Sequence, residues 1–267
     1  MLPHYNIIVF LHNKNPNIID MKNTFFAIMF LATGLMMVAC NNNPKNNGQA
    51  VESESTEIVA TETPTDEVAM EEEIDELDAI KAIRDVWAEK PITVEGDKTN
   101  AGIGQFAMAL CKMYPDFVVN KVLGDYLVAP QDFVNEWYEV ENQSDNGFVR
   151  CVMMVETTHE TNACYWNRKN GHKLFAAYMQ AAYESGDMED LVVFYDYDPA
   201  TGVMTPEPAL TESIEKQGKD YDYYEVRLPQ EGKDIVLYVC TRNEELDNYD
   251  CNDLIMKWNG MRFDFKK

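Results

Sequence analysis

The sequence predicts an α+β fold that is mainly β, with N-terminal helices packed on an antiparallel meander of successive β-hairpins. Two patterns predict it. Apolar residues recur at helical spacing only in the first part of the folded region, and later short apolar runs alternate with turns that end in glycine. We therefore expect a globular domain over residues 76–267, with helices over about 76–125 and hairpins over about 132–267.

The predicted helices are amphipathic. The first begins near Glu76 and ends before Pro91, because proline cannot continue a helix. Its apolar side chains recur every three or four residues: Leu77, Ile80, Ile83 and Trp87. The second helix spans about 101–114, and one of its faces carries Ile103, Phe106, Ala107, Leu110 and Met113. Each helix is therefore expected to cover part of the sheet that follows.

Five turns that end in glycine divide the β-rich region. They are Asn146-Gly147, Asn170-Gly171, Thr201-Gly202, Glu231-Gly232 and Asn259-Gly260. Successive glycines are 24, 31, 30 and 28 residues apart, which suits one hairpin in each interval. The run over residues 191–195 is apolar on both faces, so we expect it to be a central strand covered by the helices.

Turn chemistry also predicts the register of two hairpins. A two-residue turn at Asn259-Gly260 places three apolar pairs on one face: Trp258 with Met261, Met256 with Phe263, and Leu254 with Phe265. The same register sets Lys257 opposite Arg262, a like-charge pair. A two-residue turn at Asn170-Gly171 places Trp166 opposite Phe175 and Cys164 opposite Ala177.

Five of the six cysteines lie in the predicted domain: Cys111, Cys151, Cys164, Cys240 and Cys251. A tight turn near residues 157–158 would set Cys151 opposite Cys164, and a turn near Glu245 would set Cys240 opposite Cys251. Cross-strand neighbours are within disulfide reach, so both pairs are candidate disulfides, with buried free thiols as the alternative. Because five is odd, at least one thiol stays free; Cys111 lies beside an apolar helix face and is expected to be buried.

The N-terminal region has the outline of a signal peptide. Residues 24–39 carry no charge, follow Met21-Lys22-Asn23 and precede Cys40. This run is shorter than the roughly 20 apolar residues of a membrane-spanning helix, which makes an uncleaved anchor the weaker alternative. Residues 1–20 fit no leader pattern, so we expect them to be a spurious extension and Met21 to be the start of a signal peptide over residues 21–39.

The end of this leader resembles a bacterial lipobox. Met37, Val38 and Ala39 precede Cys40, although the family usually has leucine where Met37 stands. The resemblance implies cleavage before Cys40 and lipid attachment to its sulfur. The expected partner is therefore a lipid bilayer, bound through the acylated Cys40.

A strongly acidic segment follows the cysteine. Residues 41–75 contain ten acidic side chains and one basic one, Lys45. Such a composition cannot bury enough apolar surface to offset its ordering entropy, so residues 40–75 are predicted to be a disordered tether. An acidic docking tail for a basic partner is the alternative.

Three segments in the C-terminal half resemble segments of uncharacterised lipoproteins of Bacteroides-type bacteria: CYWNRKNGHKLFA, LVVFYDYDPATGVMTPEP and LIMKWNGMRFDF. The resemblance covers about residues 148–267 and implies an envelope protein without a known activity or known site residues. In such lipoproteins, acidic residues directly after the cysteine resemble a signal for export to the cell surface. Here residues 41–43 are asparagine, so we expect the periplasmic side of the outer membrane rather than the surface.

The charge excludes one class of partner. The chain has a net charge of −24, and residues 76–267 alone contain 35 acidic and 19 basic side chains. A surface this acidic repels phosphate backbones, so a nucleic-acid partner is not expected. A cationic protein partner is compatible with it. The oligomeric state is left open.

The sequence contains no strong catalytic motif. None of Ser144, Ser185 and Ser213 lies in a Gly-x-Ser-x-Gly elbow, and the spacing of His159, Cys151 and Cys164 matches no zinc pattern. No catalytic, cofactor-binding or metal-binding residue is therefore predicted. We expect a non-catalytic, membrane-anchored envelope lipoprotein of unknown ligand. The alternatives are an inhibitor or scavenger of cationic proteins and a carboxylate- or metal-dependent envelope enzyme.

Overall fold

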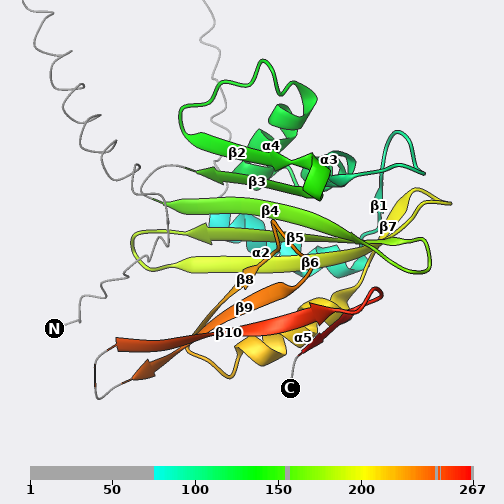
Figure 1. Cartoon of the computed structure of the whole chain (residues 1–267). Coiled ribbons are helices and arrows are strands. Elements are labelled where there is room, and N and C mark those ends of the chain that lie inside the picture. Colours follow the sequence, from blue (N-terminus) through cyan, green and yellow to red (C-terminus); the bar gives the residue numbers. More distant parts are fainter. Residues whose placement is uncertain (1–74, 154–156, 244–245, 247, 266–267) are drawn as a thin grey trace, which may run out of the picture. The chain divides into compact units, whose positions relative to one another are not determined.

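The computed structural model describes residues 75–153, 157–243, 246 and 248–265. These residues form an α+β domain that is mainly β, as predicted, with two antiparallel sheets and four α-helices (Figure 1). The predicted leader, Cys40 and the predicted tether up to residue 74 lie outside the described residues.

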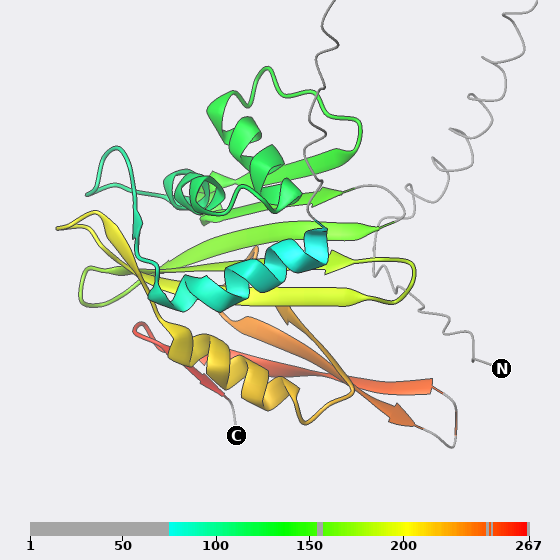
Figure 2. The ribbon, with the colours of Figure 1, turned by 180° about the vertical axis from the view of Figure 1, so that it is seen from behind.

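The helices include both of those predicted. They are α2 (Glu76–Val86), followed by the short 3-10 turn η1 (Trp87–Glu89), α3 (Ile103–Met113), α4 (Val118–Val128) and α5 (Pro208–Gly218). Asp75 caps the first helix, because its side chain accepts a hydrogen bond from the Leu77 N–H at 2.9 Å. Figure 2 shows α2, α3 and α4 on one face of the larger sheet, and α5 beside the smaller one.

The larger sheet has seven strands in the order β1-β7-β6-β5-β4-β3-β2. They are β1 (Ile92–Thr93), β2 (Tyr138–Gln143), β3 (Phe148–Met153), β4 (Thr158–Asn167), β5 (Lys173–Ala182), β6 (Met188–Asp198) and β7 (Val203–Pro206). The smaller sheet has the order β11-β10-β9-β8. Its strands are β8 (Tyr223–Arg227), β9 (Ile235–Asn243), β10 (Asn248–Trp258) and β11 (Phe263–Phe265).

All five predicted glycine turns connect consecutive, paired antiparallel strands. The glycine in each turn has a positive φ, the conformation that glycine tolerates best. The turns join β2 to β3, β4 to β5, β6 to β7, β8 to β9 and β10 to β11. The prediction of one hairpin per interval is confirmed for three of the four intervals, which hold the pairs β3–β4, β5–β6 and β9–β10. It is wrong between Gly202 and Gly232, where α5 lies between β7 and β8 and these two strands belong to different sheets.

The central strands of the larger sheet are buried on both faces, and their pleat divides the interior into two cores. Along β5, Phe175 and Ala177 face α2, α3 and α4 in the first core. Leu174 and Ala176 face the smaller sheet and α5 in the second core. Residues 191–195 are buried on both faces, as predicted. The face turned away from α2, α3 and α4 is covered by the smaller sheet and α5. The sequence pattern did not predict this cover.

The predicted register at Asn170-Gly171 is wrong by one residue. Trp166 pairs with Leu174, and Cys164 pairs with Ala176. The connection spans 168–172, with the Arg168 N–H donating to the His172 carbonyl, and is longer than a two-residue turn. Because side chains alternate, this shift sends Phe175 and Ala177 into the first core while Trp166 and Cys164 face the second.

The register at Asn259-Gly260 is wrong by two residues. Met256 pairs with Phe265, and Trp258 pairs with Phe263. An even shift keeps the strand side chains on their predicted face, so these four residues still meet in the second core. Met261, predicted opposite Trp258, instead lies exposed in the connection between the two strands. Lys257 now lies opposite Asp264, and the predicted like-charge pair with Arg262 does not form.

Candidate functional site

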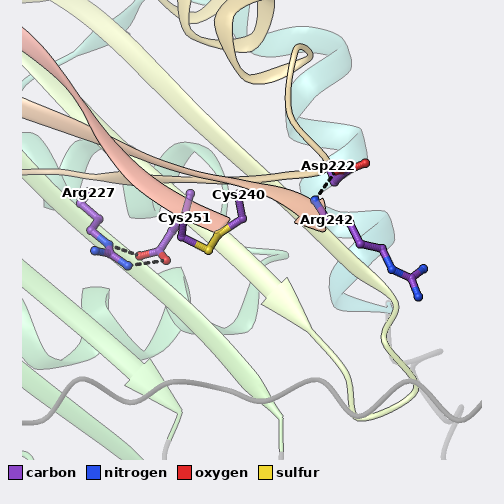
Figure 3. Close-up of a disulfide and its surroundings, with 6 residues drawn as sticks. Asp222, Arg227, Cys240, Arg242 and Cys251 are labelled. Atoms are coloured by element: carbon purple, nitrogen blue, oxygen red, sulfur yellow. Dashed lines mark hydrogen bonds and ion pairs between the residues drawn. A yellow bond between two sulfur atoms is a disulfide. The ribbon is translucent and has the colours of Figure 1, made fainter. Parts of the chain in front are cut away.

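The β9–β10 hairpin carries the disulfide predicted between Cys240 and Cys251. The two residues are direct cross-strand neighbours with a Cα–Cα distance of 4.1 Å, and their sulfurs are bonded (Figure 3). Cys240 is buried and Cys251 is exposed, so the bond lies at the surface of the smaller sheet. It joins residues on either side of the hairpin loop, 11 positions apart in the chain.

The predicted disulfide between Cys151 and Cys164 does not form. Cys151 pairs with Thr161, which is three residues from Cys164, and an odd offset puts two side chains on opposite faces of a sheet. Cys151 accordingly lies in the first core and Cys164 in the second. Both are free and buried, as is Cys111. Burial raises the pKa of Cys111 and of Cys151 to about 12, so these thiols are inert toward oxidants.

Charged side chains surround the disulfide. Arg227 donates two hydrogen bonds to Glu225, at 2.9 and 3.2 Å, and its guanidinium lies 4.1 Å from the centre of the Tyr238 ring. The Arg242 N–H donates to Asp222 at 2.7 Å on the other side of the disulfide (Figure 3). The surface around the disulfide is therefore polar, with an ion pair on β8 and a carboxylate held by a main-chain N–H of β9.

A small polar pocket adjoins this surface, between β3, β4 and β8. Its volume is about 260 Å³, and its apolar lining consists of Phe148, Val226 and Leu228. Arg150 and Glu160 form its charged wall on the larger sheet, with Arg150 Nη2 at 2.6 Å from Glu160 Oε2. The pair Arg227–Glu225 forms the opposite wall.

Asn162 gives the pocket an unsatisfied hydrogen-bond acceptor. Its side chain donates to Glu160 Oε1 at 3.2 Å, while its Oδ1 is buried without a partner among the described residues. A buried acceptor without a donor is costly to the folded state. The carboxylates are already held by guanidinium groups, which suits the pocket to binding rather than to proton transfer.

A second charged cluster ties the start of α5 to the larger sheet. Arg168 is almost fully buried and donates to Asp196 and, at 2.6 and 2.7 Å, to both oxygens of Glu207. His172 Nδ1 lies 2.6 Å from the other oxygen of Asp196. Each charge has a partner of opposite sign, so this cluster serves to hold the three elements together.

Among the carboxyl groups of the described residues, Asp190 has the most raised pKa. It lies on β6 beside the second core, and burial raises its pKa to about 6. The Tyr178 hydroxyl donates to its Oδ2 at 3.2 Å, while the charge of nearby Arg84 opposes the rise. Arg84 itself is held by Glu189 at 2.9 Å and Glu215 at 2.6 Å.

The structure does not assemble the zinc site considered from the sequence. His159 is buried on the same face as Cys151, with its ring packed on Tyr183, whereas Cys164 faces the other core. Over the described ranges, no group of three or more histidine, cysteine, aspartate or glutamate side chains is placed to hold a metal ion. The described helices are also too short or too polar to cross a bilayer.

The polar pocket and the Arg168 cluster were not predicted from the sequence. One local signal was present, because Arg150, Glu160 and Asp196 are charged residues within strands that also carry buried apolar residues. A charge at a buried strand position requires a partner, but the sequence alone does not say which one.

Comparison of the chain with protein-family models, with curated proteins and with solved structures found no match in any of the three.

Proposed function

We propose that the protein is a lipid-anchored bacterial envelope protein whose folded domain acts by binding. In this proposal the mature chain begins at an acylated Cys40, and residues 41–74 connect the anchor to the domain that starts at Asp75. The lipobox-like residues before Cys40 support the anchor. Three acyl chains would hold the protein far more firmly than the marginal binding of a single chain.

The observation that carries the proposal is the disulfide between Cys240 and Cys251. Disulfides form and persist in oxidising compartments and are rare where thiols are kept reduced. Because Cys251 is exposed, a cytoplasmic reductant would have access to the bond. The disulfide therefore favours export, which is what a lipoprotein leader would achieve.

Binding is favoured over catalysis by the state of the charged groups. In the polar pocket, Arg150 is paired with Glu160 and Arg227 with Glu225, so no free carboxylate faces a reacting molecule there. We propose the periplasmic face of the outer membrane as the location, because asparagines rather than acidic residues follow Cys40.

Intact-mass measurement of the protein purified from bacterial membranes tests both parts of the export proposal. We expect a chain that begins at Cys40 and carries acyl chains, with two additional thiols appearing only on reduction. The C40A variant should remain unacylated. An unmodified N-terminus that retains residues 21–39 would overturn the anchor, and five free thiols in the native protein would overturn the disulfide.

The location needs a separate measurement. Protease treatment of intact cells should leave the domain uncut if it lies on the periplasmic face, and should cut it once the outer membrane is permeabilised. Cleavage in intact cells would assign it to the cell surface instead.

A second candidate function is the binding of cationic proteins, as an inhibitor or scavenger. It is favoured by the excess of acidic residues over basic ones in residues 76–267, 35 against 19. Pull-down of a folded basic protein such as cytochrome c at low and at high salt tests it, because screening weakens attraction between surface charges. Retention that is insensitive to salt, or no retention at low salt, would count against this function.

A further inference from the structure

We propose that the loop over residues 129–137 and the outer edge of β2 together dock an extended, cationic segment of another protein. We call this surface the β2 docking edge. The proposal deepens the second candidate function and rests on it, since it says where and in what form a cationic partner binds.

Exposed apolar side chains provide the anchors of the β2 docking edge. Trp137 is 59% exposed, Val134 is 90% exposed, and Val128 at the end of α4 is 74% exposed. By contrast, Trp87 and Trp166 are each 4% exposed. Tryptophan is enriched among the residues that dominate protein interfaces, and clustered exposed apolar residues mark interaction sites.

The loop that carries Val134 and Trp137 is ordered by its own contacts. Asn135 Oδ1 accepts hydrogen bonds from the N–H groups of Trp137 and Tyr138, at 2.9 and 3.2 Å. The Phe133 ring packs edge-on against Tyr126 of α4, with 5.4 Å between ring centres. Little conformational entropy therefore needs to be lost when a partner contacts Trp137.

The strand that follows the loop has an open edge. β2 is the last strand of the seven-stranded sheet, and within the described ranges it pairs only with β3 (Figure 1). The N–H and C=O groups of an edge strand can add a further strand from another chain, which supplies affinity through the main chain.

Charge selects the partner. Between Lys121 and Arg150 the chain has six acidic residues and no basic one. They are Asp125, Asp132, Glu136, Glu139, Glu141 and Asp145. Five of these six side chains are exposed, Glu141 being partly buried. Electrostatic complementarity therefore favours a basic partner and disfavours an anionic lipid surface.

The pleat of β2 predicts the pattern of the partner segment. Glu139 and Glu141 project from one face of the strand, and Tyr138 and Val140 project from the other, where they pack against the first core. A strand added beside β2 would place its successive side chains next to these two faces in turn. The structure therefore assigns the partner an alternation of basic and apolar residues.

A peptide of alternating lysine and valine, added to the full-length mature protein, tests the proposal. We expect binding that protects the amides of β2 from hydrogen exchange and that weakens about tenfold between about 50 and about 300 mM salt. The W137A variant should bind about tenfold more weakly or worse. The D132N/E136Q double variant should also bind the peptide more weakly. Because it keeps Trp137, it tests the surface even if W137A fails to fold.

A matched control removes two exposed acidic residues elsewhere. The E212Q/D220N double variant, altered on α5 and just after it, has the same change in net charge and should bind the peptide like the wild type. Equal affinities for all variants, or protection of another strand, would overturn the β2 docking edge.

The same measurements separate this proposal from the function on which it rests. If cytochrome c binds in a salt-sensitive way but the peptide does not, the cationic function stands and the β2 docking edge is overturned. If neither binds at low salt, both fail. Self-association of the wild-type chain that W137A abolishes would assign the edge to a second copy and overturn the proposal.

Discussion

Asp190 illustrates how one buried residue couples the domain to pH. Burial raises its pKa most, and the hydrogen bond from Tyr178 opposes that rise. The charges of Glu189 and Glu215 add to the rise. In the unfolded chain an aspartate has a pKa of about 3.9, so the folded state binds this proton more tightly.

The pH dependence of stability follows from that difference. Because the folded pKa of about 6 is the higher one, the stabilisation is complete below about pH 4 and is lost as the pH rises through 6. We expect this residue to lower the free energy of unfolding by up to about 2 kcal/mol between pH 4 and pH 7.

Urea unfolding of the wild type and of D190N at several pH values measures the contribution of Asp190 to the pH dependence of stability. The difference between the two proteins isolates Asp190 from carboxyls such as Asp198 and Asp234, whose pKa values are lowered and whose effect has the opposite sign. A difference that does not change with pH would contradict the prediction.

At the scale of strands and turns, the sequence predicts which segments pair better than it predicts their register. The pairing of Cys240 with Cys251 is correct, whereas the same reasoning placed Cys151 opposite Cys164, which is wrong. The registers at Asn170-Gly171 and Asn259-Gly260 were wrong because a glycine marks a turn without giving its length. An even error, as at Asn259-Gly260, leaves the side chains within the strands on the correct face, whereas an odd one does not.

Helix α5 was missed for a related reason. It occupies part of the 30-residue interval between Gly202 and Gly232, which the spacing of glycine turns assigned to a hairpin. Pro208 at its first turn is a helix-start signal, but only Leu210 and Ile214 give it an apolar stripe. So short a stripe does not outweigh a regular spacing of turns.

The Arg168 cluster predicts an unequal cost for two arginine substitutions. R168A would leave Asp196 and Glu207 without their guanidinium partner in a largely buried place, so we expect a loss of about 3 kcal/mol in unfolding free energy. R262A, whose exposed side chain lies 3.3 Å from Asp264, should cost less than about 0.5 kcal/mol.

Chemical denaturation of the R168A and R262A variants measures the loss of unfolding free energy in each. R168K offers a further comparison, because lysine keeps the charge but cannot donate to both oxygens of Glu207 in the same way. Similar losses for R168A and R262A would mean that the cluster does not hold α5 to the sheet.

For the whole molecule, composition and periodicity sufficed for the fold class but not for the division into two sheets. Strands β8 to β11 have the same alternation and turns as those before them, so nothing local marks where the meander leaves the larger sheet. That division depends on the second face of β5 and β6, whose apolar residues need a cover.

Because the two cores share the strands of one sheet, we expect them to unfold together. Trp87 lies in the first core, and Trp166 and Trp258 contact the second. A variant that keeps only Trp87 and a variant that keeps only Trp166 and Trp258 report on the cores separately by fluorescence. In each variant the fluorescence midpoint in urea should coincide with that of circular dichroism. Two separated transitions would show that the cores are independent.

The placement of the cysteines constrains the order of events during oxidative folding. In the unfolded chain, Cys151 and Cys164 are 13 residues apart, and Cys240 and Cys251 are 11 apart, so closing either loop costs nearly the same entropy. Local encounter therefore does not distinguish the native pair from the wrong one.

The strand pairing of the larger sheet distinguishes the native cysteine pair from the wrong one. Once β3 and β4 pair in their native register, Cys151 and Cys164 lie on opposite faces and are buried. A bond made earlier would set the two cysteines side by side and hold these strands three residues out of register. In an oxidising compartment, formation of the β3–β4 hairpin before its thiols are oxidised would therefore prevent this wrong disulfide.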